Sequence, residues 1–231
     1  MELTDAARHK TRTTIIKVAA KLLRAEGAEG VTTRAVATEA DVQAPTIYRI
    51  FGDKDGLLDA VAEHVFATYV ATKARTKPSG DPVADLRAGW DLHIEFSLAN
   101  PEVFTLLVDP RRHASPAVAA GHEVLRGKIH RVAAAGRLRI AEAHAVELLH
   151  ATGTGVLLSL IARPPAERDL ALADLAFDAI LRAIITNAPS APAGNVTAAA
   201  VTLRSSLGSL DALSPGEAAL MGEWLQRVIK R

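Results

Sequence analysis

Apolar residues recur along nearly the whole chain with the spacing of amphipathic helices. In the first such segment, residues 8–26, Ile15, Ala19 and Leu22 follow one another at i, i+4 and i+7 and form one apolar face. No convincing segment alternates apolar and polar residues as a half-buried strand does, so a parallel-sheet nucleotide-binding fold is not expected. The pattern predicts an all-α protein of about nine to eleven helices.

Polar residues and prolines mark where these helices begin. A capping residue stands directly before a proline at three predicted starts: Asp81, Asn100 and Ser115. Thr32 and Asp53 are the predicted caps of the second and fourth helices. Ser214 and Glu217 have the spacing of a capping box that opens the last helix. Residues 189–194, rich in proline and glycine, are predicted to form a linker.

The N-terminal segments predict a helix-turn-helix. Gly27 and Gly30 stop the first helix; two short helices, from Thr33 and over 44–51, follow with a turn at residues 41–43 between them. Such a unit exposes the start of its second helix, which fits the major groove of DNA. The residues predicted to be exposed are Ala44, Pro45, Thr46, Tyr48 and Arg49, and those predicted to be buried are Val42, Ile47 and Phe51.

The overall charge does not point to DNA. The chain carries 27 basic and 26 acidic residues, a net charge of +1, and composition alone favours a protein that does not bind nucleic acid. Any contact with DNA must therefore come from a local surface. Cysteine is absent, which excludes disulfides and thiolate metal sites and fits a reducing compartment.

Residues 32–54 resemble the signature of the TetR family of transcriptional regulators. The matching positions are Thr32, Val36, Ala37, Ala40, Val42, Thr46, Ile47, Tyr48, Phe51 and Lys54. Two positions depart from the family pattern. Asp41 replaces the usual turn glycine, and it tolerates the left-handed conformation better than most residues. Gln43 replaces the usual serine cap and is expected to cap its helix weakly.

The resemblance implies a role for each DNA-facing residue. Thr46, Tyr48 and Lys54 match positions that contact phosphates, and Thr32 and Thr33 are placed to meet the backbone as well. The positions that approach base edges are held by Arg34, Ala44, Pro45 and Arg49. Taken alone, the same residues have simpler explanations: a packing tyrosine, solvated Lys54 and Arg49 side chains, and an ion pair of Arg34 with Glu39 or another carboxylate.

The resemblance also implies the organisation of the whole chain. It indicates a DNA-binding domain at residues 1–54, a linking helix at 55–80, and a larger helical domain at 81–231 for effector binding and dimerisation. Two long apolar helices, 142–163 and 166–187, are the predicted dimer contacts, and the alternative is the core of a monomer. Their predicted contact residues are Val146, Leu149, Gly153, Val156, Leu157, Leu160, Leu172, Leu175, Ala176, Ala179, Ile180 and Ile184.

An effector pocket is expected among the middle helices. Trp90, His93 and Phe96 recur at helical spacing, and with Phe104 they are the predicted lining of a site for an apolar or aromatic molecule. Ordinary core packing would explain the same residues. The scattered histidines, His113, His122, His130 and His144, lack metal-ligand spacing, so no metal site and no cofactor are expected.

The N-terminus is polar and lacks the apolar region of a signal peptide. The most apolar stretch, 148–162, contains His150 and is shorter than the about 20 residues of a membrane span. A membrane partner is therefore not expected, and the protein is expected to be cytoplasmic.

These observations together predict a ligand-responsive regulator of transcription, a repressor rather than an enzyme. It would bind a palindromic operator as a homodimer and be released by an unidentified small molecule. Two alternatives stand beside this hypothesis. One is a helical interaction module without DNA binding, and the other is an all-helical enzyme using His93 or His144, for which no nucleophile–base arrangement is visible.

Overall fold

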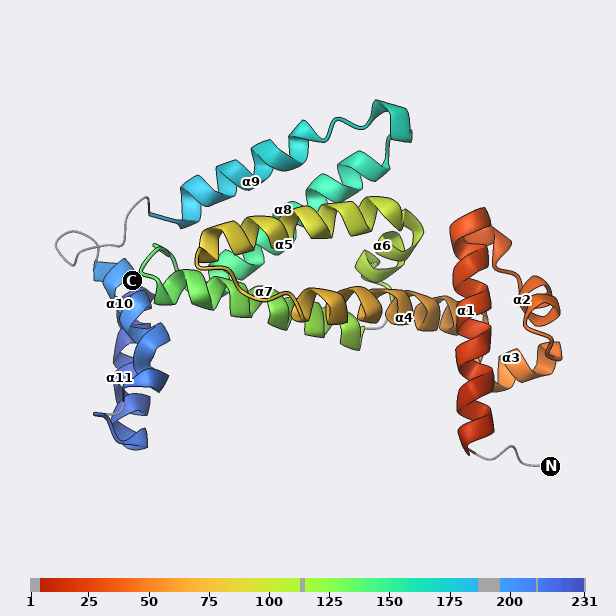
Figure 1. The fold of residues 1–231 in the computed structure, drawn as a ribbon, viewed down its shortest axis with the longest axis horizontal. Helices are drawn as coiled ribbons and strands as arrows, with labels where there is room; N and C mark the ends of the chain where they lie inside the picture. The colour runs from red at the N-terminus through yellow and green to blue at the C-terminus, as the bar shows by residue number, and fades with distance from the viewer. Residues whose placement is uncertain (1–4, 113–114, 187–195, 211, 231) are drawn as a thin grey trace. The chain divides into compact units, whose positions relative to one another are not determined.

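A computed structural model of the chain describes residues 5–112, 115–186, 196–210 and 212–230. These residues form eleven α-helices and no strand, apart from one isolated bridge between Leu138 and Ile185, so the all-α prediction is confirmed (Figure 1). The helices are α1 (Asp5–Gly30), α2 (Thr33–Glu39), α3 (Ala44–Phe51), α4 (Lys54–Ala74), α5 (Pro82–Ala99), α6 (Pro101–Val108), α7 (Pro116–Ala134), α8 (Glu142–Ile161), α9 (Ala171–Ile184), α10 (Val196–Ser206) and α11 (Pro215–Ile229).

The helices divide into two compact units. The first contains residues 1–75 and 96–121, and the second contains residues 76–95 and 122–231. The first unit therefore includes α4, which the sequence predicts as a linking helix, together with α6. The functional division at residues 54 and 80 stays a prediction.

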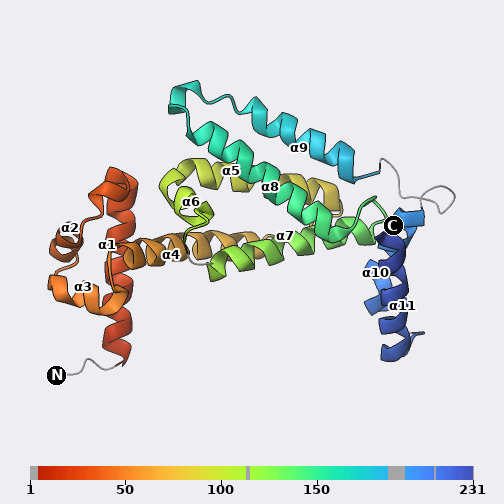
Figure 2. The same ribbon diagram turned by 180° about the vertical axis from the view of Figure 1, so that it is seen from behind.

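The first unit is built around the N-terminal helices. Ile15 of α1, Val36 of α2, Ile47 of α3 and Leu57 of α4 are all buried in one core. Figure 1 shows α2 and α3 beside α1, and Figure 2 shows the same arrangement from behind. Gly27 has a φ of 72° and a ψ of −174°, so the regular helix is interrupted at a glycine predicted to stop it.

Most of the predicted caps are present. Thr32 Oγ1 accepts from Ala35 N at 3.1 Å, and Ser115 Oγ accepts from Val118 N at 3.2 Å. Ser214 and Glu217 form the complete capping box. Asn100 is the exception, because its Nδ2 donates to the carbonyl of Phe96 and its side chain does not cap α6.

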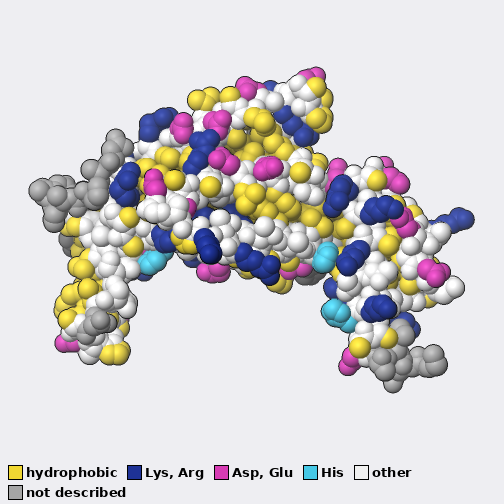
Figure 3. All heavy atoms as spheres, viewed as in Figure 1, with side chains coloured by type: hydrophobic (Ala, Val, Ile, Leu, Met, Phe, Trp, Pro, Cys, Tyr) yellow, Lys and Arg dark blue, Asp and Glu magenta, His cyan; other side chains and the backbone are white. Residues whose placement is uncertain are grey.

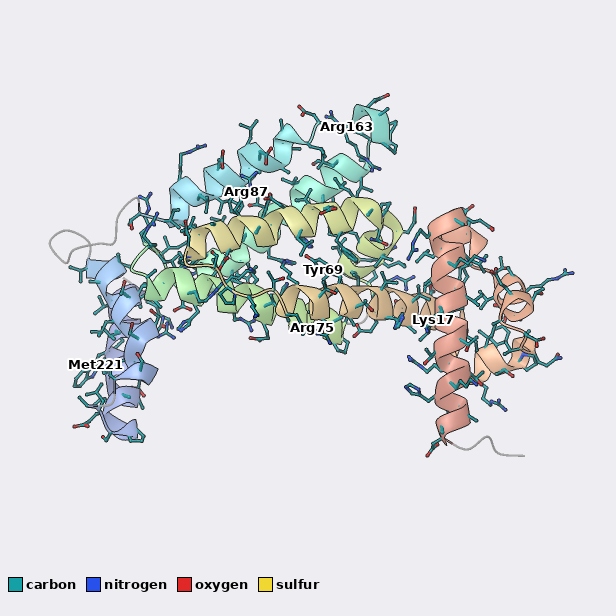
Figure 4. The ribbon with its side chains drawn as sticks, in the orientation of Figure 1. Lys17, Tyr69, Arg75, Arg87, Arg163 and Met221 are labelled. Carbon is teal, nitrogen blue, oxygen red and sulfur yellow. The ribbon has the colours of Figure 1, made fainter. Side chains whose placement is uncertain are left out.

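The second unit contains α8 and α9, which pack together, and the hairpin of α10 and α11. The ring of Trp90 lies 5.3 Å from that of Phe177, and a Cβ on Gly153 would approach Trp90 Cζ3 to 3.3 Å. Figure 4 labels Arg87 on α5, which forms ion pairs with Asp174 and Asp178 of α9. Close packing on Trp90 therefore joins α5 to α8 and α9, and ion pairs of Arg87 add to the contact between α5 and α9.

The predicted helix over 166–187 is wrong in extent. A short 3₁₀ turn, Pro165–Glu167, precedes α9, and α9 begins only at Ala171. Two prolines at 164 and 165 favour a turn over a continuous helix start, because proline limits the conformation of the residue before it. The predicted linker at 189–194 lies outside the described residues.

Helix α8 is the one segment of the described chain long and apolar enough to cross a membrane. It also contributes Val146, Leu149, Val156, Leu157 and Leu160 to the buried core. Of its apolar window 39% is buried inside the protein, and length and composition alone are weak evidence for a membrane span.

This burial corrects the predicted dimer face of α8. The six residues named for it are buried within one chain, and so are Ile180 and Ile184 of α9. The exposed apolar residues of α8 and α9 lie on other positions: Leu148, Leu158, Leu172 and Leu175. Helical periodicity locates the apolar face of α8, but it does not say whether the same chain or a second copy covers that face.

Candidate nucleic-acid interface

The turn between α2 and α3 depends on Asp41. Asp41 has a φ of 51°, the left-handed conformation expected where the family pattern has glycine. The turn is closed by Val42 N, which donates to the carbonyl of Ala37 at 3.0 Å. Asp41 therefore fixes the direction in which α3 leaves α2.

Helix α3 begins with a backbone contact and no side-chain cap. Gln43 has an extended backbone, with φ −76° and ψ 137°, and its side chain caps nothing. Its carbonyl accepts from Thr46 N at 2.8 Å, and Pro45 stands in the first turn, where its missing N–H costs nothing. The expectation of a weak cap is confirmed.

We expect Gln43→Ser to raise the free energy of unfolding by up to about 1 kcal/mol, because a serine hydroxyl accepts from the free amides at the start of α3. Urea unfolding followed by circular dichroism measures the change. Gln43→Ala is the matched control and should change little, since alanine is as poor a cap as the present glutamine. Equal stability of the serine and alanine variants would contradict this account of the α3 start.

The two faces of α3 differ most clearly at Ile47 and Tyr48. Ile47 is 2% exposed and anchors the helix in the core, whereas Tyr48 is 53% exposed. Arg49 and Pro45 are also exposed, and Ala44 and Thr46 are half-buried. Val42 and Phe51, predicted to be buried, are partly buried against the same core. The tyrosine and arginine are thus held outward by a helix whose other side is fixed.

The start of α2 adds a second set of polar groups. Thr32 and Arg34 are exposed and Thr33 is half-buried. Glu39, the alternative partner of Arg34, instead forms an ion pair with Lys21 of α1. The proposed Arg34–Glu39 pair is therefore absent, and the described residues give Arg34 no other ion pair within 4.0 Å.

Lys54 is exposed as the first residue of α4, in a tightly defined turn. Asp53 Oδ1 accepts from Gly56 N at 2.8 Å and caps the helix. A Cβ on Gly56 would lie 2.1 Å from the carbonyl oxygen of Phe51, so only glycine fits there. These contacts fix the backbone from which the lysine extends.

Arg112 reinforces the same turn from the segment after α6. Its guanidinium pairs with Asp55 Oδ1 at 2.7 Å and also with Asp59. The arginine side chain is 18% exposed, but Asp55 is 76% exposed and Asp59 37%, so of the two pairs only that with Asp59 lies partly out of water, where ion pairs are screened less. Sequence reasoning missed Arg112, since nothing in the sequence links residues 112 and 55.

Basic side chains of α1 lie near α3 as well. The guanidinium of Arg12 stands over the ring of Phe51 at 5.5 Å from its centre. Figure 3 shows Lys and Arg side chains in dark blue over α1 to α3, with acidic side chains between them. Basic and acidic side chains are therefore interspersed on this surface, in keeping with the net charge of +1.

The predicted effector residues are divided between the units. Trp90 and His93 belong to the second unit, and Phe96 and Phe104 belong to the first. Trp90 and Phe104 are 7% and 5% exposed, and His93 and Phe96 are half-buried. Phe96 stacks on Tyr69, with ring centres 4.2 Å apart.

Two histidines that look scattered in the sequence are neighbours in the fold. His122 Nε2 lies 3.2 Å from His150 Nδ1, and burial together with the His122 ring lowers the pKa of His150. The described residues hold no group of three or more potential metal ligands. His113 lies outside the described residues.

Comparison with known proteins finds a family match over the N-terminal helices. The family described as "Bacterial regulatory proteins, tetR family" matches residues 15–61, which include α2, α3 and the exposed face of α3. The chain is 30% identical over 105 residues to the HTH-type transcriptional repressor NicS of Pseudomonas putida. That match covers 45% of this chain, and the chain spans only 50% of the length of that relative.

Solved structures share the fold over a longer span. A TetR-family transcriptional regulator from Pectobacterium atrosepticum covers 80% of this chain and 100% of its own, with a TM-score of 0.66 and 21% identity. SmeT, the repressor of the Stenotrophomonas maltophilia multidrug efflux pump SmeDEF, covers 79% of this chain and 94% of its own. Its TM-score is 0.58 and its identity is 25%.

Proposed function

Because the chain belongs to the TetR family of bacterial regulatory proteins through its N-terminal domain, we propose that it regulates transcription by binding a palindromic operator as a homodimer. One observation carries this proposal: α3 presents Tyr48 and Arg49 outward while Ile47 fixes its other side in the core. A helix held this way fits the major groove of DNA.

The DNA contacts we propose follow from exposure and chemistry. Arg49 and Arg34 have the donors to read guanine, whose O6 and N7 accept a bidentate pair. Ala44 and Pro45 offer apolar contact to a thymine methyl. Phosphates would be met by Thr32, Thr33, Thr46, Tyr48 and Lys54.

Repression is the favoured mode of regulation. NicS and SmeT are both described as repressors, and a dimer seated on an operator blocks the passage of polymerase. The TetR family is one of regulators and not of enzymes, and this argues against a hydrolase using His93 or His144. A regulator of this kind acts in the cytoplasm, where the DNA is.

The dimer would form through the exposed faces of α8 and α9. Leu148, Ala151, Gly155 and Leu158 are exposed on α8 and follow the alternating three- and four-residue spacing of a helix–helix seam. On α9, Leu172 and Leu175 are 41% and 65% exposed. A chain that exposes such apolar rows on two packed helices has a surface suited to a second copy.

An effector with a hydrogen-bond acceptor is favoured by an unsatisfied donor. Trp90 Nε1 is buried and has no hydrogen-bond partner among the described residues. Leaving such a group unpaired costs about 1–3 kcal/mol, which a ligand acceptor would recover. A structure of SmeT holds triclosan, a chlorinated phenol, so ligand binding by a neighbour in fold has a precedent.

Helix α4 is the proposed transmitter within the first unit. It carries Lys54 at its start and Tyr69, labelled in Figure 4, in its last third. Tyr69 stacks on Phe96 and packs near Phe66, and burial raises the pKa of its phenol. A ligand that contacts this cluster within the first unit would shift α4 only if its affinity differs between two states of the protein.

A gel-shift titration tests the proposal. Duplexes tiled across the promoter neighbouring the coding sequence should give one specific shift, whose affinity falls as salt rises. Triclosan, used as an aromatic probe, should weaken that shift if the effector site accepts phenols, and failure of the probe alone leaves DNA binding intact. Absence of a specific shift on every duplex at low salt would overturn the function.

A further inference from the structure

The last two helices form a hairpin with a core of its own, which we call the arm (residues 196–210 and 212–230). Ala198 and Val201 of α10 are 0% and 2% exposed, and Ile229 of α11 is 9% exposed. A Cβ on Gly222 would lie 3.5 Å from Leu207 Cδ1, so Gly222 marks the inner face of α11. The capping box at Ser214 stabilises the start of α11.

The outer face of α11 is apolar and exposed. Leu220, Trp224 and Val228 recur every four residues and are 46%, 54% and 37% exposed. Figure 3 shows hydrophobic side chains in yellow gathered over the lower part of the arm, and Figure 4 labels Met221 on the same helix. Exposed tryptophan is costly in water and is the residue most enriched at energetic centres of protein interfaces.

The charges on this face are self-complementary. An α-helix turns by about 100° per residue, so Glu217 and Arg227 lie on the same outward side as Leu220 and Trp224. Glu217 is in the first turn, where its Oε2 also accepts from Ser214 N at 2.9 Å, and Arg227 is in the last turn, 3.8 Å from Glu223 on the same helix. Suppose that two copies of α11 pack antiparallel, with their Gly222 residues level along the common axis. Leu220 of each copy then lies against Trp224 of the other, and Glu217 lies against Arg227.

We propose that α11 pairs antiparallel with α11 of a second copy of this chain, with Leu220 against Trp224 and Glu217 against Arg227. The matched acidic and basic ends favour a second copy over other occupants. A membrane surface would require a polar face rich in Lys and Arg, whereas Glu217 and Glu223 flank this apolar row. The pairing does not depend on DNA binding and is tested without DNA.

Disulfide trapping tests the pairing at a defined register, because the chain has no cysteine of its own. Full-length Leu220→Cys and Trp224→Cys proteins, one carrying a mass tag, are mixed and oxidised. In the proposed register the two Cβ atoms come within the about 3.5–4.5 Å that a disulfide needs, whereas like positions are offset by about 6 Å along the axis. The tagged–untagged disulfide should therefore exceed either homotypic product by at least about tenfold.

Glu223→Cys, an exposed position on the flank of α11, is the control and should form little disulfide. Circular dichroism establishes that each variant is folded. Trp224→Glu in the full chain should remove one association step in sedimentation velocity, and Arg227→Glu should weaken the same step. Statistical disulfide ratios, trapping equal to that of the control, or an unchanged assembly of the Trp224→Glu variant would overturn the pairing.

Discussion

Replacing Arg49 with alanine is expected to weaken specific operator binding by roughly 30-fold to 10⁴-fold. Each bidentate arginine–guanine pair contributes about 1–3 kcal/mol of discrimination, and a symmetric dimer loses two of them. Since about 1.4 kcal/mol is a tenfold change, the two losses together give this range. The side chain is exposed on a helix anchored by Ile47, so the substitution should leave the fold intact.

Fluorescence anisotropy on an operator duplex and on a scrambled duplex measures this change. Binding to the scrambled duplex should change much less, because base readout is lost while phosphate contacts remain. Tyr48→Phe should weaken both duplexes alike, since its hydroxyl would donate to a phosphate. Arg163→Ala, an exposed arginine after α8, is the matched control (Figure 4). Equal operator affinities of the wild type and the Arg49→Ala variant would show that Arg49 does not contact the operator.

Placing glutamate at both Leu158 and Leu175 is expected to abolish dimerisation through α8 and α9. Burying four unpaired carboxylates at a symmetric seam costs far more free energy than the apolar contacts contribute. Operator affinity should fall by more than about 100-fold, because a single helix-turn-helix keeps only one half-site. Both leucines are exposed, at 44% and 65%, so each protomer should stay folded.

Sedimentation velocity reports the mass, and the measurement uses chains that also carry Trp224→Glu so that the arm contributes no association. Thr68→Glu and Thr105→Glu together are the control, since both threonines are exposed in the first unit and add the same charge. A dimer that survives the two leucine substitutions would show that α8 and α9 do not form the seam.

Local chemistry made the N-terminal part predictable from sequence. Thr32 and Asp53 cap their helices, Asp41 adopts the expected left-handed turn, and Ile47 points inward. Each of these features depends on residues within four positions, so the pattern of the chain contains the information. The exposure of Tyr48 follows from the same periodicity.

Features that depend on distant residues were not predictable in the same way. The alternative of an Arg34–Glu39 ion pair fails because Lys21 of another helix pairs with Glu39. The apolar face of α8 is covered within the chain by Trp90 and its neighbours, and the pattern of α8 alone does not say what covers it. Arg112 and the His122–His150 contact join residues far apart in sequence, and no local pattern signals them.

Methylation protection of guanine N7 on the bound operator tests the central claim most directly, because N7 lies in the major groove. The account predicts protected guanines in two symmetric half-sites whose centres are about one helical turn, or a multiple of it, apart. It also predicts that the protection disappears with the Arg49→Ala variant. A bound complex in which every guanine N7 stays reactive would contradict an α3 helix seated in the major groove.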